Sequence, residues 1–323
     1  MTEDTTKLSQ PWDNPLGFKI ERILVPLDFS PASLGTLDYA VWLAKQFRAG
    51  IHLVHVYPPD EASSMPGAGH LLFESAEAIE RFNEKLTNIH RKHVPTFRPE
   101  NCHVRGGRPY EEIVRVAREI RADLIVLSTR GHSGLKHLLL GSTAERVVRN
   151  APCPVLVARK RKQRSKVTRE AFAIRTILVP TDFSQCSLAG TEYAAFLARK
   201  FGAILRLVHA TYPYTNYVFV DRAGVRLSGL AEAVEETARQ EMNALKQMDF
   251  LRGLIVEADL LPCPPVDEIC AAAGSPDVDL IVTSTHGRTG LKHALIGSVA
   301  EHVVRYADRP VLVVPPVIAP APD

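Results

Sequence analysis

The strongest constraint on this chain is that its sequence repeats itself. Residues 128–157 read STRGHSGLKHLLLGSTAERVVRNAPCPVLV, and residues 284–313 read STHGRTGLKHALIGSVAEHVVRYADRPVLV. Paired without gaps, the two segments are identical at 20 of 30 positions. The halves also begin alike, with ILVPLDFS at 23–30 and ILVPTDFS at 177–184. The chain is therefore a duplication, and its shared segments are glycine-rich turns beside strands, where a phosphate-bearing ligand is expected.

Length and composition agree with two ordinary globular domains. The 323 residues leave about 150 to each copy, which is a common domain size. With 46% hydrophobic residues, 23% charged residues and a net charge of +3, the composition is that of an ordinary globular protein and gives no overall signal of polyanion binding. No apolar run approaches the roughly 18 residues of a membrane span, and the N-terminus lacks a signal-peptide pattern. We therefore expect a cytoplasmic protein that does not enter a membrane.

The cysteines point to neither a disulfide framework nor a metal site. An odd number without CxxC spacing is typical of reduced cytosolic thiols. Neither copy repeats a cysteine position of the other, so a catalytic cysteine is not expected. The five residues are Cys102, Cys153, Cys186, Cys263 and Cys270.

Strands alternate with helices along both copies. Apolar runs bounded by turn residues predict strands, and apolar residues at three- and four-residue steps predict helices. Such alternation predicts an α/β fold with a doubly wound parallel sheet. The predicted strands are 21–26, 51–56, 102–105, 124–128 and 154–158, then 176–180, 205–210, 254–260, 280–284 and 310–314. The predicted helices are 30–47, 71–93, 109–120 and 142–150, then 184–201, 229–248, 266–273 and 298–307.

The expected domain boundaries follow from the two copies and from composition. We predict a disordered tail at 1–18, a first domain at 19–159, a basic linker at 160–170, a second domain at 171–315 and a Pro-rich disordered tail at 316–323. Around the linker, residues 159–169 (RKRKQRSKVTR) hold seven basic residues and no acidic one. Such a run is typical either of a nucleic-acid patch or of a solvated linker, and we favour the linker.

Two glycine elements in each copy are candidate phosphate-binding sites. Glycine permits positive φ and leaves backbone N–H groups uncovered, while a helix N-terminus offers unpaired N–H donors. For the serines there is also a structural alternative, because Ser142 to Glu145 and Ser298 to Glu301 have the spacing of a capping box. The first element holds Gly131 and Gly134, matched by Gly287 and Gly290; the second holds Gly141, Ser142 and Thr143, matched by Gly297, Ser298 and Val299.

An acidic residue follows the first strand of each copy. Asp28 and its counterpart Asp182 lie just past the carboxyl end of that strand. A carboxylate there, beside a glycine-rich loop, can accept a hydrogen bond from a ribose hydroxyl or from the adenine edge. The alternative role is to orient the helix that begins at Ser30 or Ser184. We favour the binding role.

The ordered motifs ILVPxDFS, LVHV, GRPYEEI, the glycine segment and PVLV resemble the universal stress protein (UspA-type) family, over nearly all of both halves. The resemblance implies two tandem Rossmann-like (UspA/HUP-type) domains, each a five-stranded, mainly parallel sheet flanked by helices. The ATP-binding members of this family carry a sequence pattern of Gly, two residues, Gly, nine residues, Gly and then Ser or Thr. The nucleotide residues implied in the first copy are Pro26, Leu27, Asp28, Val56, Ser128, Arg130, Gly131, Gly134, Gly141, Ser142 and Thr143. Those implied in the second are Pro180, Thr181, Asp182, Ala210, Ser284, His286, Gly287, Gly290, Gly297, Ser298 and Val299.

This chain departs from the family pattern at its first glycine. Ser128 and Ser284 stand there, and a side chain at that point either blocks ATP or adds a hydroxyl contact. The turn at Gly107 also becomes Cys263-Pro264-Pro265 in the second copy. If only one copy binds nucleotide, we therefore expect it to be the first.

Motifs for fast chemistry are absent from the sequence. There is no G-x-x-x-x-G-K-[ST] loop, no G-x-S-x-G elbow and no HExxH helix. His55 and His209 end apolar strands and are interpreted as structural rather than as general bases. Lys136 and Lys292 beside the phosphate loops either neutralise phosphate or are solvated, and the sequence does not favour one. We expect no metabolic enzyme and at most a slow ATPase.

Three hypotheses about partners follow. The first is a cytosolic stress protein that binds ATP, with or without Mg²⁺, in one or both domains and acts as a regulator. The second is a nucleotide-free scaffold that acts through protein partners. The third is nucleic-acid binding through the basic run, which we do not expect.

The resemblance also implies how the two domains pair. In the resembled family single domains pair through the last strand, so 155–157 and 311–313 imply an intrachain pseudo-dimer and leave room for a homodimer.

Overall fold

The computed structural model describes residues 17–57, 69–96, 98–128, 140–159, 173–211, 230–262, 264–287 and 297–316. Its first half contains β1 (Arg22–Pro26), α1 (Pro31–Phe47), β2 (Gly50–Tyr57), α2 (Gly69–His93), β3 (Cys102–Gly106), α3 (Pro109–Glu119), β4 (Leu124–Ser128), α4 (Ser142–Asn150) and β5 (Val155–Ala158). Its second half contains β6 (Thr176–Pro180), α5 (Gln185–Phe201), β7 (Ile204–Thr211), α6 (Leu230–Lys246), β8 (Val256–Pro262), α7 (Pro265–Ala273), β9 (Leu280–Ser284), α8 (Ser298–Tyr306) and β10 (Val311–Val314). The predicted order of strands and helices is confirmed, although β8 begins two residues later than predicted.

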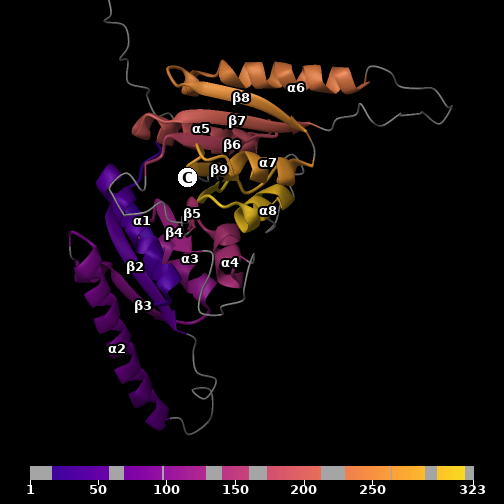
Figure 1. Ribbon diagram of the computed structural model, residues 1–323. Coiled ribbons are helices and arrows are strands. Elements are labelled where there is room, and N and C mark those ends of the chain that lie inside the picture. Colours follow the sequence, from indigo (N-terminus) through magenta and orange to yellow (C-terminus); the bar gives the residue numbers. More distant parts are fainter. Residues whose placement is uncertain are drawn as a thin grey trace, which may run out of the picture.

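All ten strands belong to one sheet with the order β3-β2-β1-β4-β5-β10-β9-β6-β7-β8 (Figure 1). Within each half every pairing is parallel, as expected when each crossover contains a helix. The α/β fold class is therefore confirmed. The two halves meet where β5 pairs antiparallel with β10, with Leu156 opposite Leu312. The edge strands β3 and β8 lie at opposite ends of the molecule, beside α2 and α6 respectively (Figure 1).

Helices cover both faces of the sheet, and the apolar core is continuous through the junction. One core cluster contains buried residues of α1, α2, α5 and α6, and the other contains buried residues of α3, α4, α7 and α8. Strands β4, β5, β9 and β10 are almost wholly buried, which explains their uninterrupted apolar sequences. β5 and β10 would each be the edge strand of their own half, so their burial depends on the junction.

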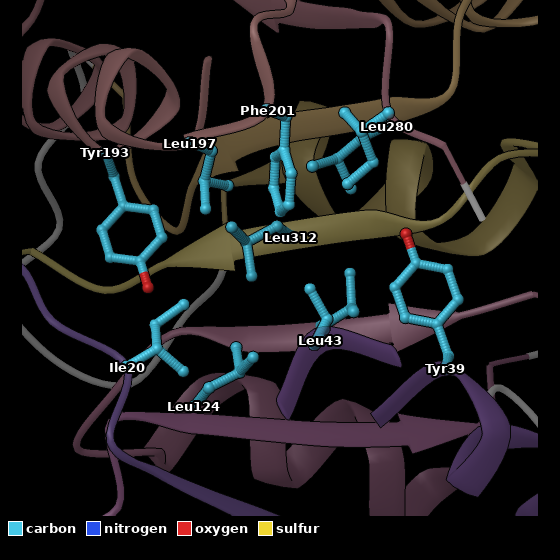
Figure 2. Close-up of a pocket in the computed structure, with 11 residues that line it drawn as sticks. Ile20, Tyr39, Leu43, Leu124, Tyr193, Leu197, Phe201, Leu280 and Leu312 are labelled. Carbon is cyan, nitrogen blue, oxygen red and sulfur yellow. The ribbon is translucent and has the colours of Figure 1, made fainter. Parts of the chain in front are cut away.

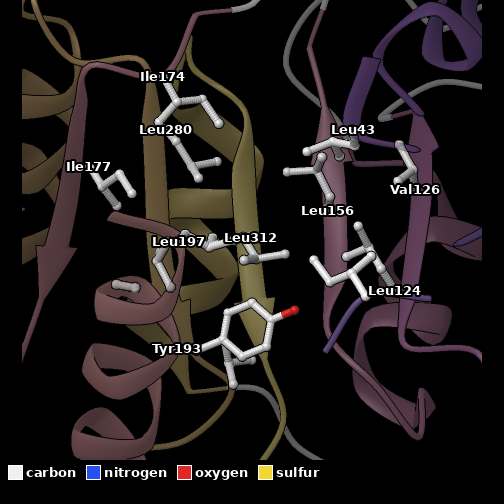
Figure 3. Packing of buried hydrophobic residues seen from close by; sticks show 14 of the residues in the cluster. Leu43, Leu124, Val126, Leu156, Ile174, Ile177, Tyr193, Leu197, Leu280 and Leu312 are labelled. Atoms are coloured by element: carbon white, nitrogen blue, oxygen red, sulfur yellow. The ribbon is translucent and has the colours of Figure 1, made fainter. Parts of the chain in front are cut away.

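Equivalent side chains of the two halves face one another across the junction. Tyr39 and Tyr193 line a small apolar cavity of about 20 Å³, together with three pairs of leucines (Figure 2). Figure 3 shows Leu312 and Leu156 on neighbouring strands within this cluster. The paired leucines are Leu43 with Leu197, Leu124 with Leu280 and Leu156 with Leu312. On the same face the ring of Trp42 stacks on that of Phe201, with centroids 5.3 Å apart.

The opposite face of the junction carries a ring of charges between α4 and α8. Within each helix a glutamate accepts from an arginine one turn later, Glu145 from Arg149 at 2.7 Å and Glu301 from Arg305 at 3.0 Å. Each arginine also approaches the other helix's glutamate, at 3.7 and 3.8 Å. All four side chains are about one-quarter exposed, so their attraction is only partly screened by solvent. The junction thus has an apolar face and a charged face.

The junction core generates the first prediction. Replacing Leu312 by Ala removes a buried side chain from the strand that joins the halves, and should lower the free energy of unfolding by about 2–5 kcal/mol. Urea denaturation measures the change. Ile255→Ala is the matched control because that side chain is 67% exposed, so its effect should be near zero. Equal effects of the two substitutions would contradict a packed junction.

A pair of histidines distinguishes the edge of the first half from that of the second. His52 Nδ1 of β2 lies 3.2 Å from His103 Nε2 of β3, with the ring planes nearly parallel at 12°. At the same register of the second half, Arg206 Nε donates to Asp259 Oδ2 at 3.0 Å. Burial and the neighbouring His103 lower the pKa of His52 to about 4, and burial lowers that of His103. The charged groups that act on the pair are Arg22, His90, Glu100, Arg105 and Glu119.

This pair generates a second prediction. Because the pKa of His52 is lower in the folded than in the unfolded chain, stability present above pH 6.5 is lost as the pH falls towards about 4. The protection factors of the β2–β3 amides against hydrogen exchange should therefore fall in acid more than those of the β7–β8 amides. The double variant His52→Arg with His103→Asp, which copies the second half, should abolish this difference. An unchanged acid response in that variant would show that the histidines are not its cause.

Candidate functional site

The turn after β1 and after β6 has the same unusual conformation. Phe29 and Phe183 adopt φ of 63° and 62°, a left-handed conformation that is strained for an aromatic residue. The preceding aspartates stabilise the turn, since Asp28 Oδ1 and Asp182 Oδ1 accept the backbone N–H two residues later at 2.9 and 3.0 Å. The alternative role expected for these aspartates, orienting the following helix, is therefore observed.

The next residue caps the helix that leads away from the site. Ser30 and Ser184 are the N-cap residues of α1 and α5, and their hydroxyls accept from the N–H three residues later at 3.2 Å. The N-termini of α1 and α5 are thus satisfied by the chain's own serines. This confirms the predicted start of α1 at Ser30-Pro31.

A histidine supports each turn from the neighbouring strand. His55 Nδ1 lies 2.8 Å from the Leu27 carbonyl oxygen, and His209 Nδ1 lies 2.8 Å from that of Thr181. The His55 ring also lies 4.2 Å from that of Phe29, measured between centroids. The equivalent contact to Phe183 is 4.4 Å. These contacts agree with the interpretation of both histidines as structural residues.

In the second half, the aspartate and both glycine elements converge. A Cβ added to Gly287 would lie only 2.6 Å from Asp182 Oδ2, so the carboxylate rests against the bare Cα. A Cβ added to Gly297 would lie 3.8 Å from the Gly287 nitrogen, and Gly297 N donates to Thr285 O at 2.7 Å. Glycine is required at 287 by this close approach rather than by its φ. The spacing in sequence has therefore become one compact cluster at the carboxyl ends of β6 and β9.

The structure corrects the predicted capping boxes. The N-cap residues of α4 and α8 are Gly141 and Gly297, without a side-chain cap, and Ser142 and Ser298 already lie in the first helical turn. Glu145 pairs instead with Arg149, because a residue one position further into the helix no longer reaches back to the cap. Among the described residues, the first N–H groups of α4 and α8 are thus not used by a capping side chain. This is the arrangement that an anion at a helix N-terminus needs.

Other predicted residues lie at the same end of the sheet. Pro26 pairs with Val54 in the register, so Val56 extends beyond the end of β1. Pro180 pairs with Val208, and Ala210 extends likewise. Thr181 is buried, and its hydroxyl accepts from Phe183 N at 3.1 Å. Arg130, Gly131, Gly134, Gly290, Lys136, Lys292 and Cys263 lie outside the described residues, as do 160–170 of the basic linker.

The described residues supply no metal-binding cluster or activated thiol at this site. The described residues contain no group of three His, Cys, Asp or Glu side chains that could hold a metal ion. Burial and the nearby Asp182 raise the pKa of the Cys186 thiol, so this cysteine is not activated as a thiolate. No helix in the described part of the chain is long and apolar enough to cross a membrane. The cluster therefore offers backbone donors and a carboxylate, rather than a nucleophile with its base.

Two features of the site had not been predicted. The left-handed Phe29 and Phe183 carry no sequence signal, because aromatic residues rarely adopt positive φ. Gly190 of α5 packs against Ser284, and it replaces Thr36 of the first copy. Comparing the two helices position by position would have singled out this difference.

A third prediction tests the contact between Gly287 and Asp182. Gly287→Ala must displace the carboxylate, and should lower the free energy of unfolding by about 1–3 kcal/mol, as strain or an altered buried contact typically does. Gly35→Ala in α1 is the matched control, since its added Cβ meets nothing within 4 Å. It should be neutral or stabilising by up to about 1 kcal/mol. Chemical denaturation of both variants measures the difference, and equal values would argue against the close contact.

Known proteins resemble the chain both in sequence and in structure. The Universal stress protein family matches residues 19–159 and 173–315. A universal stress protein of Methanocaldococcus jannaschii is 35% identical over 143 residues, which cover 44% of this chain and 84% of that protein. One of Mycobacterium tuberculosis is 28% identical over 207 residues, covering 64% of this chain and 65% of that protein.

Solved structures agree at the level of the fold. The crystal structure of a universal stress protein from Archaeoglobus fulgidus superposes with a TM-score of 0.61 at 22% identity, covering 91% of this chain and 98% of that one. A structure described as a putative universal stress protein from Pseudomonas aeruginosa gives 0.56 at 20% identity, covering 92% and 94%. With two matches that together span most of its length, the chain belongs to the universal stress protein family as a member with two domains in tandem.

Proposed function

We propose that the chain binds an adenine nucleotide, ATP with or without Mg²⁺, in one or both domains and acts in a stress response as a regulator. The observation that carries the proposal is the cluster of Asp182, Gly287 and Gly297 at the start of α8. A phosphate group would be held by the backbone N–H groups at the beginning of this helix. The ribose or the adenine edge would meet the carboxylate of Asp182.

The first half supplies the same parts where it is described. Asp28 follows β1 in the same strained turn, and the N-cap residue of α4 is Gly141, without a side-chain cap. The ATP-binding pattern of the family extends to this half through Gly131 and Gly141, with Ser128 at its first position. The proposal therefore covers both domains, although the glycine loop of the first lies outside the described residues.

Within this proposal the protein is a binding protein rather than a metabolic enzyme. Backbone donors can cradle phosphates, yet hydrolysis also needs groups that stabilise the transition state or position water. His209, a histidine near Asp182 in the described part of the chain, is engaged with the Thr181 carbonyl and supports the turn. ATP hydrolysis would accordingly be slow. A cytoplasmic location and reduced thiols are part of the same proposal.

The joining of the halves supports a pseudo-dimer within one chain. In the resembled family single domains pair through the last strand, and here β5 and β10 pair with each other. We propose that this arrangement persists in solution and leaves further homodimerisation to other surfaces, such as the edge strands β3 and β8.

Calorimetric titration with MgATP tests the binding proposal and gives a fourth prediction. Asp182→Ala should weaken or abolish binding at the second site, because a hydrogen bond to a charged group contributes about 1.5–3 kcal/mol, roughly ten- to a hundredfold in affinity. Asp28→Ala should do the same at the first. Asp249→Ala, an exposed acidic residue in the turn after α6, is the control and should leave binding unchanged.

The result that contradicts this proposal is absence of binding at millimolar nucleotide. That outcome would favour the alternative function, a nucleotide-free scaffold in which the aspartates only orient α1 and α5.

A further inference from the structure

The histidine pair at the edge of the first half lies away from the candidate nucleotide sites. His52 and His103 are near the beginning of β2 and β3, whereas the candidate sites form at the carboxyl ends of the strands. The residues on either side of His52, Ile51 and Leu53, belong to the core cluster shared with α1 and α2. His52 therefore projects to the opposite face of the sheet, where His103 lies beside it. Both residues are half-buried, so solvent reaches this part of the edge.

The two imidazole nitrogens have nearly the separation of two ligands of one metal ion. His52 Nδ1 and His103 Nε2 are 3.2 Å apart. Two Zn–N bonds of about 2.0–2.1 Å at the tetrahedral angle place their nitrogens about 3.3–3.4 Å apart. The spacing of the two strands therefore already suits chelation of one ion by both rings.

Chelation requires the rings to turn, because each nitrogen now faces the other. The ring centroids are 5.5 Å apart and the ring planes differ by only 12°. For both lone pairs to converge on one ion at the tetrahedral angle, each ring has to turn by about 40°. The last torsion of a histidine side chain is broad, so this rotation costs little. The ring that donates the hydrogen bond moves its proton to its far nitrogen, and both rings stay uncharged.

Both imidazoles are in the form that binds metal. Burial and the neighbouring His103 lower the pKa of His52 to about 4, and burial lowers the pKa of His103. The two rings are therefore mainly uncharged at neutral pH, and an uncharged imidazole is a common metal ligand. An ion does not have to displace a bound proton from the pair.

The carboxylates that act on the pair are held by arginines. Glu119 Oε2 accepts from Arg105 at 3.0 Å, and Glu100 Oε1 lies 3.9 Å from Arg98 Nη1. Among the described residues the pair thus supplies two ligands, which agrees with the absence of any group of three there. Water is left to fill the remaining positions. Imidazole ligands suit zinc, copper or nickel, whereas Mg²⁺ and Ca²⁺ prefer oxygen ligands.

The second half has an ion pair at the same register instead. Arg206 Nε of β7 donates to Asp259 Oδ2 of β8 at 3.0 Å. A guanidinium stays protonated and has no lone pair to offer a metal. The second half therefore serves as a control for the first within the same chain.

We propose that His52 and His103 form a binding site for a late first-row divalent ion, with Zn²⁺ as the test case, and that the ion ties the edge strand β3 to β2. Zinc binding here is independent of the proposed nucleotide binding, because the pair lies at the other end of the strands from Asp28. The alternative is that the pair is only a hydrogen bond between two strands.

Hydrogen exchange of the full chain at neutral pH, with and without Zn²⁺, gives the fifth prediction. Calorimetric titration with Zn²⁺ first supplies the Kd. At a zinc concentration of about ten times the Kd, the β2–β3 amides that exchange through opening of this edge should slow about tenfold. The β7–β8 amides should not change, and Mg²⁺ should affect neither edge.

Two variants separate this site from the other histidines of the chain. His52→Arg with His103→Asp copies the ion pair of the second half, so it keeps a bridge between the strands while removing both ligands. The protection by zinc should be lost in this double variant. His302→Gln removes a histidine of α8 and should keep the protection. Absence of zinc protection in the unmodified chain, or its persistence in the double variant, would overturn the site.

Discussion

The antiparallel pairing of β5 with β10 is the interaction on which the remainder of the architecture depends. It turns two five-stranded sheets into one, and it buries strands that either half alone would leave at an edge. The pairing is symmetric about Leu156 and Leu312, which lie opposite each other. Equivalent residues of the two halves, such as Tyr39 and Tyr193, therefore meet around one cavity. The pairing also brings α4 and α8 together through Glu145, Arg149, Glu301 and Arg305. Each of these two helices begins at a candidate phosphate site, so the junction and the sites share structural elements.

Parallel strands explain where each site forms. Their carboxyl ends meet at one edge of the sheet, so the residues after β6 and β9 become neighbours although they are about a hundred positions apart in the sequence. The strained turn at Phe183 then directs Asp182 towards the bare Cα of Gly287. Strain of this kind persists only where the surroundings over-determine it, and here His209, Ser184 and the carboxylate do so.

Much of this could be predicted from the sequence, for identifiable reasons. The duplication and the alternation of strands and helices determined the fold class, and Asp182, Gly287 and Gly297 were expected to act together. The capping boxes were wrong because a spacing of three residues does not say whether Ser142 or Gly141 begins the helix. The packing of Ser284 against helix α5 could not be deduced from its own position, because the residue it packs against, Gly190, lies on another element. Likewise, His52 and His103 stand where the second half has the ion pair of Arg206 and Asp259, and this correspondence is visible only once the register of the strands is known.

A crystal structure of the chain grown with ATP tests the central claim most directly, because it reports the place of binding as well as its existence. We expect phosphate oxygens at the first N–H groups of α8, beside Gly287 and Gly297, with the nucleoside next to Asp182. Ser284 should still donate to the carbonyl of His286 in that complex. A nucleotide bound elsewhere, or a site that stays empty at millimolar ATP, would contradict it.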